Sequence, residues 1–128
     1  MLPPDDLDYL KARAPQHVVS SEGGMICVVL PAFPIPEGLS PATSDLLFRL
    51  SPGYPDVPPD MWWFNPPIRR TNGGAIPATQ VQERHLGRDW QRWSRHLSPG
   101  QWRSGVDSIE SYLSLVHKEL DSAAKAIA

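Results

Sequence analysis

The sequence contains little cysteine, little net charge and no long apolar run. Cys27 is the single cysteine among 128 residues, which excludes an intramolecular disulfide and a zinc site built from several cysteines. The formal net charge of −2 at pH 7 provides no overall field that would attract nucleic acid or an anionic membrane. The longest apolar run, Met25 to Phe33, is too short to cross a bilayer, and Asp5 and Asp6 stand where a signal peptide has basic and apolar residues. We therefore expect a cytoplasmic protein that does not interact with membranes.

Proline, by contrast, is abundant and is concentrated in the middle of the chain. Fifteen residues are proline, and ten of them lie between Pro31 and Pro67. The chain is also 41% hydrophobic and contains five tryptophans, whereas disordered chains have few large apolar side chains. We therefore predict one folded domain over residues 1–128, with proline-rich connections between its elements.

The residue pattern predicts a helix followed by an antiparallel meander of about four strands. Helical residues are expected at 4–14, because acidic residues stand at the start of this segment and Pro15 ends it. A hairpin is expected around Gly23 and Gly24, with strands at 17–19 and 25–30. Residues 44–50 and 61–64 read as the third and fourth strands. The predicted fold class is α+β.

The last third of the chain is mixed until a clear helix near its end. Between residues 80 and 102 arginines recur at helix-compatible spacing, but Gly87 disfavours a continuous helix. Further on, Ser104 or Asp107 is expected to cap a helix, and residues 122–128 are expected to fray. The apolar stripe predicted for this helix consists of Val106, Ile109, Leu113, Val116 and Leu120.

The proline-rich segment carries a motif that indicates a family. Tyr54, Pro55, Pro58 and Pro59 form a Tyr-Pro-x-x-Pro-Pro sequence between two predicted strands. In this setting the motif resembles the signature of the ubiquitin-conjugating-enzyme fold, which has an N-terminal helix, a four-stranded antiparallel meander and one or more C-terminal helices. The predicted order of elements matches that fold. Trp102 and the segments at 90–96 and 108–113 make the chain similar to prokaryotic family E of this superfamily.

The resemblance implies a role in a bacterial ubiquitin-like protein modification pathway. The implied partners are an activating enzyme and a ubiquitin-like protein whose C-terminus would lie near residues 72–93. A conjugating enzyme carries its cargo on a cysteine after the fourth strand, because a thiolate is a strong nucleophile. Here no cysteine follows Cys27, which we expect to be buried and inert. The family's His-Pro-Asn sequence is also missing, and Asn72 is the nearest equivalent.

Two interpretations of the catalytic region follow. In the first, a histidine replaces the cysteine: the family's spacing, counted back from a tryptophan, falls near His85, which Glu83 could orient while Arg84 binds a carboxylate. The candidate catalytic residues are His85, Arg84, Asn72 and His96. In the second, the domain is a non-catalytic adaptor that binds a ubiquitin-like protein or an activating enzyme. The sequence leaves open whether chemistry occurs.

Other classes of function have less support in the sequence. The tryptophans and arginines between residues 90 and 102 could form a stacking site for single-stranded nucleic acid, but packing of the tryptophans against the C-terminal helix is the simpler interpretation. The segments 31–36 and 55–59 could be ligands of proline-binding domains, although their place between strands argues against it. No cofactor and no metal are predicted, because the four histidines have no metal-ligand spacing.

Overall fold

The computed structural model describes residues 2–125, and its first elements are a short helix and a long hairpin. Helix α1 (Pro4–Arg13) has a proline and two acidic residues in its first turn and basic residues in its last, which suits the helix dipole. Strands β1 (Val18–Glu22) and β2 (Met25–Pro34) pair antiparallel. The helix and the hairpin therefore lie where the sequence predicts them.

A curled antiparallel sheet of six strands is the centre of the fold. The strand order is β1-β2-β4-β5-β8-β7, where β4 is Thr43–Leu50, β5 is Trp62–Asn65, β7 is Gln82–His85 and β8 is Arg88–Trp93. Two short strands, β3 (Leu39–Ser40) and β6 (Arg69–Arg70), pair separately. The α+β class is confirmed, but the expectation of about four strands was too low, because the mixed region adds a hairpin to the sheet.

This added hairpin occupies residues 82–93, where the arginine spacing suits a helix. Its turn consists of Leu86 and Gly87, both with positive φ values, 55° and 74°. A two-residue hairpin turn of this kind matches the twist of the strands that it joins. Trp90 and Trp93 are fully buried, so hydrophobic contacts with the sheet outweigh the helical spacing of the arginines.

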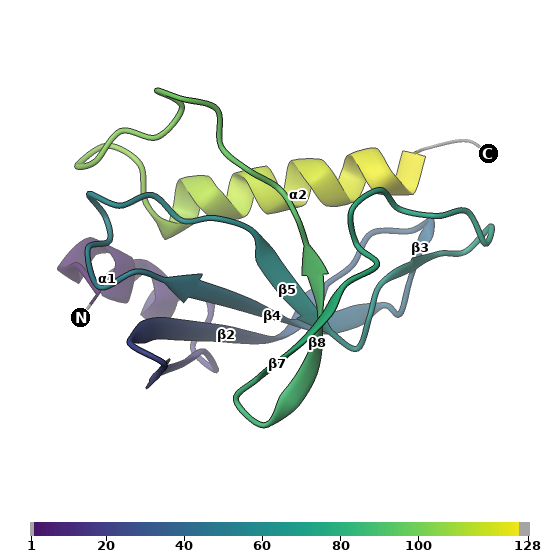
Figure 1. Ribbon diagram of the computed structural model, residues 1–128, viewed down its shortest axis with the longest axis horizontal. Coiled ribbons are helices and arrows are strands. Elements are labelled where there is room, and N and C mark those ends of the chain that lie inside the picture. The colour runs from purple at the N-terminus through teal and green to yellow at the C-terminus, as the bar shows by residue number, and fades with distance from the viewer. Residues whose placement is uncertain (1, 126–128) are drawn as a thin grey trace.

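The two faces of the sheet are covered by different elements. Helix α2 (Ile109–Lys125) runs along one face together with α1, whereas the β7–β8 hairpin curls away on the other side (Figure 1). The helix-covered face holds the main core, which includes Leu10, Phe48 and Leu120. The opposite face holds a smaller apolar cluster of five buried residues: Cys27, Val29, Leu47, Trp63 and Trp90.

A buried carboxylate joins α1, α2 and the proline-rich segment. Asp6 is 3% exposed and accepts hydrogen bonds from the Tyr54 hydroxyl at 2.7 Å and from the Ile109 backbone N–H at 3.0 Å. Burial, this hydrogen bond and the negative charge of Asp6 raise the pKa of Tyr54, so the phenol remains a donor. The backbone N–H of Ile109, the first residue of α2, is thus bonded to a side chain of α1.

The start of α2 corrects two expectations. Asp107 accepts from the Arg103 backbone N–H, and Ser104 donates to Asp56, so neither binds the first helical residue. Val106 precedes the helix and is 74% exposed, so it does not belong to the apolar stripe. The other four stripe residues are buried as predicted. The helix continues to Lys125, beyond the point where fraying was expected, and residues 126–128 lie outside the described part.

The far end of α2 is attached to the small sheet. Arg70 donates through Nε to the Ala123 carbonyl at 3.0 Å, which satisfies one of the free carbonyls near the helix end. Gly38 has φ +98°, and a Cβ there would lie 2.8 Å from the Ala124 carbonyl oxygen, so this approach requires glycine. Within residues 2–125 no helix has the length and apolar character needed to cross a membrane.

Candidate functional site

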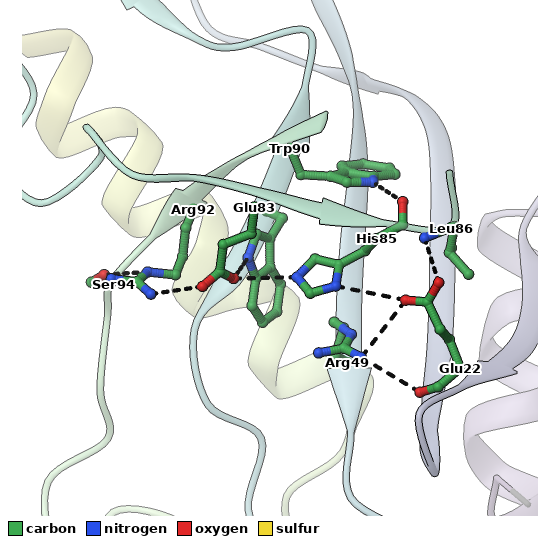
Figure 2. A network of polar contacts seen from close by, with 9 residues as sticks. Glu22, Arg49, Glu83, His85, Leu86, Trp90, Arg92 and Ser94 are labelled. Carbon is green, nitrogen blue, oxygen red and sulfur yellow. Dashed lines mark hydrogen bonds and ion pairs between the residues drawn. The ribbon is translucent and has the colours of Figure 1, made fainter. Parts of the chain in front are cut away.

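His85 lies at the end of β7 between two carboxylates. Its Nε2 is 3.2 Å from Glu83 Oε1, and its Nδ1 is 3.6 Å from Glu22 Oε1 (Figure 2). The imidazole is 12% exposed and packs edge-on against Trp63, with 5.4 Å between the ring centroids. Because both ring nitrogens face carboxylates, these contacts hold the ring in one orientation.

Glu83 is held more firmly than any other carboxylate of this network. Oε1 accepts from Trp63 Nε1 at 2.8 Å, and Oε2 accepts from Arg92 Nη1 at 2.8 Å. Burial alone would raise the pKa of Glu83, but the hydrogen bonds from Trp63, His85 and Arg92, with the positive charge of Arg92, outweigh it and lower the pKa. Glu83 therefore stays ionised beside His85. Arg92 is itself oriented by Ser94 Oγ, which lies 3.1 Å from its Nε.

Glu22 connects the turns of the two hairpins. Its Oε2 accepts from the Leu86 backbone N–H at 2.8 Å, although Glu22 ends β1 and Leu86 lies in the β7–β8 turn. Arg49 on β4 lies next to this contact, 3.8 Å from Glu22 Oε1 (Figure 2). Trp90 Nε1 donates to the His85 carbonyl at 2.9 Å and fixes the same turn from above. These contacts hold the curled sheet almost closed on itself.

A cavity of about 380 Å³ opens beside this polar network. Its polar lining comprises Arg49, Ser51, Asp60, Glu83 and His85, and its apolar lining comprises Met25, Val57, Pro58, Met61 and Trp63. The residues come from β2, β4, β5, β7 and the proline-rich segment. The site therefore combines a few charged groups with an apolar wall, as small-ligand sites do. Among residues 2–125 no three His, Cys, Asp or Glu side chains are grouped so that they could hold a metal ion.

The other sequence-predicted candidates do not join His85. Arg84 is its neighbour on the strand but points to the opposite face, where its side chain is 68% exposed and lies 3.1 Å from Asp89. Asn72 lies in the exposed turn after β6 and accepts from the Gly74 N–H at 2.7 Å, which is the bonding of a turn residue.

His96 is connected to the cavity only through its partner. It is 63% exposed, and its Nδ1 lies 2.6 Å from Asp60 Oδ1, while Asp60 lines the cavity. The predicted candidates thus occupy separate places, and His85 is the one within the polar network.

The region proposed for a partner's C-terminus contains a second cavity. This hollow of about 410 Å³ is lined by Ile68, Arg69, Arg70, Ile76 and Gln91 together with neighbouring residues of the 73–82 segment. Gln91 fixes one wall, because it accepts from the Ile68 N–H at 2.8 Å and donates to the Ile68 carbonyl at 3.0 Å. The hollow lies between β6 and β8 and overlaps the predicted range of residues 72–93, although residues 67–70 of its lining precede that range.

Cys27 is inaccessible in the sheet. Its side chain is fully buried, and its cross-strand neighbours are Ser20 on β1 and Arg49 on β4. Trp63 and Trp90 belong to the same apolar cluster. The expectation of a buried cysteine is confirmed, and no partner reaches its sulfur without opening the sheet.

The tryptophan and arginine segment does not offer a stacking surface. Trp90 and Trp93 are fully buried, on opposite faces of the sheet, so nucleic acid bases cannot stack on them. Trp93 and Trp102 pack in the core that contains α2, as expected, whereas Trp90 packs beneath the hairpin. Arg92 and Arg95 are bound to Glu83 and Glu119 rather than free for phosphates.

The motif residues at 54–59 join the loops at one end of the sheet. Tyr54 is buried against Trp102 and bonds to Asp6, and the Trp102 indole N–H donates to the Pro55 carbonyl at 2.8 Å. Pro58 lines the cavity beside His85, and Pro59 is buried. The motif is thus a structural support with one side facing the site.

Sequence reasoning missed Glu22, Arg49, Trp63 and Arg92. Arg49 carried a signal, because it is the one basic residue in a strand whose other positions are largely apolar. No feature of the sequence indicated Glu22, because the end of β1, where it lies, meets the second hairpin only when the sheet curls.

Comparison with known proteins gives one result. The model of the family described as prokaryotic E2 family E matches residues 2–123. Comparisons with curated proteins and with solved structures gave no match.

Proposed function

The chain belongs to prokaryotic E2 family E, and from this premise we propose that it binds a ubiquitin-like protein and positions it in a conjugation pathway without carrying it on a cysteine. The observation that carries the proposal is the burial of Cys27, the single cysteine of the sequence, in the middle of the sheet. A thioester requires an exposed thiolate, and this sulfur is covered on both sides.

The order of the elements supports a scaffold of the conjugating-enzyme type. A helix, a hairpin, a third strand, the Tyr-Pro-x-x-Pro-Pro segment, a fourth strand and a C-terminal helix follow each other in that order. The β7–β8 hairpin departs from this plan, because it follows the fourth strand where the catalytic segment of the family stands. The proposed scaffold therefore has a sheet extension in place of a cysteine-bearing loop.

The partners proposed are a ubiquitin-like protein and the activating enzyme that loads it. The cavity between β6 and β8 is the proposed place for the C-terminal tail of the ubiquitin-like protein, since Gly73 and Gly74 add no side chains to its lining. Arg69 lines the same cavity, is exposed and suits the carbonyl oxygens of an extended tail, whereas Arg70 already donates to the carbonyls of Ala123 and Ala75.

A second candidate function is covalent transfer through His85, which the cavity beside it favours. In that reaction His85 Nδ1 would attack the thioester carbonyl carbon, the carbon–sulfur bond would break, and the sulfur of the activating enzyme would leave as a thiolate. Glu83, which faces Nε2 at 3.2 Å, would accept the imidazole proton. Because each ring nitrogen already faces a carboxylate, one of the two would have to move before attack. Positioning without chemistry is therefore the better supported function.

One experiment separates the candidates. The protein is mixed with the ubiquitin-like protein and activating enzyme of the same organism and ATP; binding is followed by NMR and adducts by intact mass spectrometry under denaturing, non-reducing conditions. We expect binding without an adduct. An adduct that persists in Cys27→Ala, disappears in His85→Gln and remains in the control His96→Gln establishes transfer by His85. An adduct lost in Cys27→Ala, or no binding to either partner, refutes the proposed function.

A further inference from the structure

We propose that the cavity beside His85 is a binding site for an organic carboxylate, in which the Arg49 guanidinium binds the carboxylate and the apolar wall contacts the rest of the ligand. The terminal carboxylate of a peptide and a free carboxylic acid share this chemistry. The site lies on the hairpin-covered face, away from the cavity between β6 and β8, and does not depend on the conjugation role.

Arg49 has bonding capacity that the protein does not use. Its Nη2 is 3.4 Å from the Glu22 carbonyl oxygen and 3.8 Å from the Glu22 carboxylate, so both contacts are long. Its Nε is buried and has no hydrogen-bond partner among the described residues. A guanidinium has five N–H donors, and a buried donor without an acceptor is destabilising because it has lost its hydrogen bonds to water. An incoming acceptor would therefore stabilise this side chain.

The acidic residues of the wall, in contrast, already have partners. Glu83 binds Arg92 at 2.8 Å, and Asp60 binds His96 at 2.6 Å. Arg49 is thus the charged group of the cavity lining with the longest contacts, both of them to Glu22 (Figure 2), and its remaining donors suit a negatively charged acceptor. One negative charge suits the site better than two, because the carboxylates of Glu22, Glu83 and Asp60 remain nearby and would repel a dianion.

The remaining wall is apolar and of suitable size. The cavity measures about 380 Å³, near the lower end of the range of about 300–1,000 Å³ for small-molecule sites. Five apolar residues from three parts of the chain line it, as described above. A guanidinium matches a carboxylate through two parallel hydrogen bonds, which a single ammonium cannot form. A ligand with a carboxylate and a short apolar body fits both features.

Met61 on the wall is held in a conformation that its side chain disfavours. Its φ is +62°, and its backbone is fixed by the Arg95 carbonyl at 3.0 Å and by the Tyr112 hydroxyl at 2.8 Å. Non-glycine residues in this left-handed conformation are strained and are concentrated at active and ligand-binding sites. Hydrogen bonds from the surrounding structure therefore hold Met61 in a backbone conformation that methionine disfavours.

The test is an NMR titration with matched acids and amides. Isovalerate is compared with isovaleramide, and N-acetyl-leucyl-leucine with its C-terminal amide, while inorganic phosphate serves as a dianion. We expect the acids to shift the Arg49 Nε–H and Trp63 indole N–H resonances, with Kd on the order of 1 mM, and the amides to bind at least tenfold more weakly. Arg49→Gln should weaken acid binding at least tenfold and Arg49→Lys by less. The control Arg103→Gln, at an exposed arginine that does not line the cavity, should leave it unchanged.

Each outcome decides the proposal. Saturation by isovalerate alone identifies a free acid as the ligand class, and tighter binding of the peptide acid identifies a peptide C-terminus; both support the site. Equal shifts by acid and amide, tighter binding of phosphate, or no shift with either acid overturns it. The comparison of acid with amide uses the unmodified protein, so the result stands even if an Arg49 variant does not fold.

Discussion

The two faces of the sheet are built on different principles. The helix-covered face buries most of the apolar core, and its buried carboxylate, Asp6, has each oxygen bonded. The hairpin-covered face buries a cluster of five residues and surrounds it with the charged groups Glu22, Arg49, Glu83 and Arg92. Some contacts among these charged groups are long, and a cavity opens beside them.

The difference indicates a division between stability and binding. A large core with satisfied polar groups fixes one conformation, whereas partly bonded charges beside an open cavity retain capacity for a ligand. We therefore expect substitutions on the helix-covered face to change global stability. Substitutions on the hairpin-covered face are expected to change local opening, ionisation and binding.

The largest expected effect comes from Trp90→Ala. The Trp90 ring is fully buried under the hairpin, lies 4.6 Å from the Arg88 guanidinium and bonds to the His85 carbonyl. Its removal should lower the free energy of local opening of the β7–β8 hairpin by about 3–5 kcal/mol, because a cavity replaces the ring. If the two faces differ as argued, hydrogen exchange should show that β7 and β8 lose protection while α2 keeps most of its own.

Trp62→Ala is the matched control on the helix-covered face. Trp62 is also fully buried, but it packs against Tyr112 of α2 and Trp93. Its loss should lower the protection of α2 and the sheet together. An even loss of protection in both variants would show that the two faces unfold as one unit and would remove the distinction.

The next effect in size is expected for Asp6→Ala. This change leaves the Tyr54 hydroxyl and the Ile109 N–H without their acceptor in a buried place, which should cost about 2–4 kcal/mol. Urea denaturation measures it, and the exposed neighbour Asp8→Ala should stay within about 0.5 kcal/mol of the parent. Tyr54→Phe, combined with Asp6→Ala, tests the coupling. Additive costs would contradict a shared network.

The elements that sequence reasoning predicted well are those with a local signal. Both helices and the first four strands of the main sheet lie close to the predicted ranges, because proline, glycine and apolar spacing mark them within a few residues. The β7–β8 hairpin was not predicted, since a Leu-Gly turn lacks the usual turn signal and the arginine spacing suits a helix. Its formation depends on burial of Trp90 against distant strands.

The candidate site was predictable only in its centre. The contact of Glu83 with His85 was predicted, because residues two apart on a strand lie on the same face, whereas His85 itself was chosen from the family's spacing to a tryptophan. Glu22 and Arg49 come from β1 and β4, and their approach results from the curl of the sheet, which no local pattern encodes. In the same way, Asp6 bonds to the Ile109 N–H although the two residues are far apart in the sequence. The acceptor at the start of α2 could therefore not be assigned from residues near 104–107.

The smallest effect, and the sharpest test of the charged face, is the pH dependence of Glu83→Gln. The folded protein lowers the pKa of Glu83 below its unfolded value through bonds from Trp63, His85 and Arg92, despite the opposing effect of burial. A lowered folded pKa contributes stability above the unfolded pKa, and this contribution is lost as pH falls through the folded pKa. The variant should therefore lose about 1 kcal/mol or less at neutral pH, and should lose less stability than the parent on acidification. Urea denaturation at neutral pH and below about pH 4 measures both, with the exposed Glu37→Gln as the control for one lost charge. Equal acid dependence in the parent and Glu83→Gln would mean that these bonds do not stabilise the ionised carboxylate, and the hairpin-covered face would then lack the charge arrangement that distinguishes it.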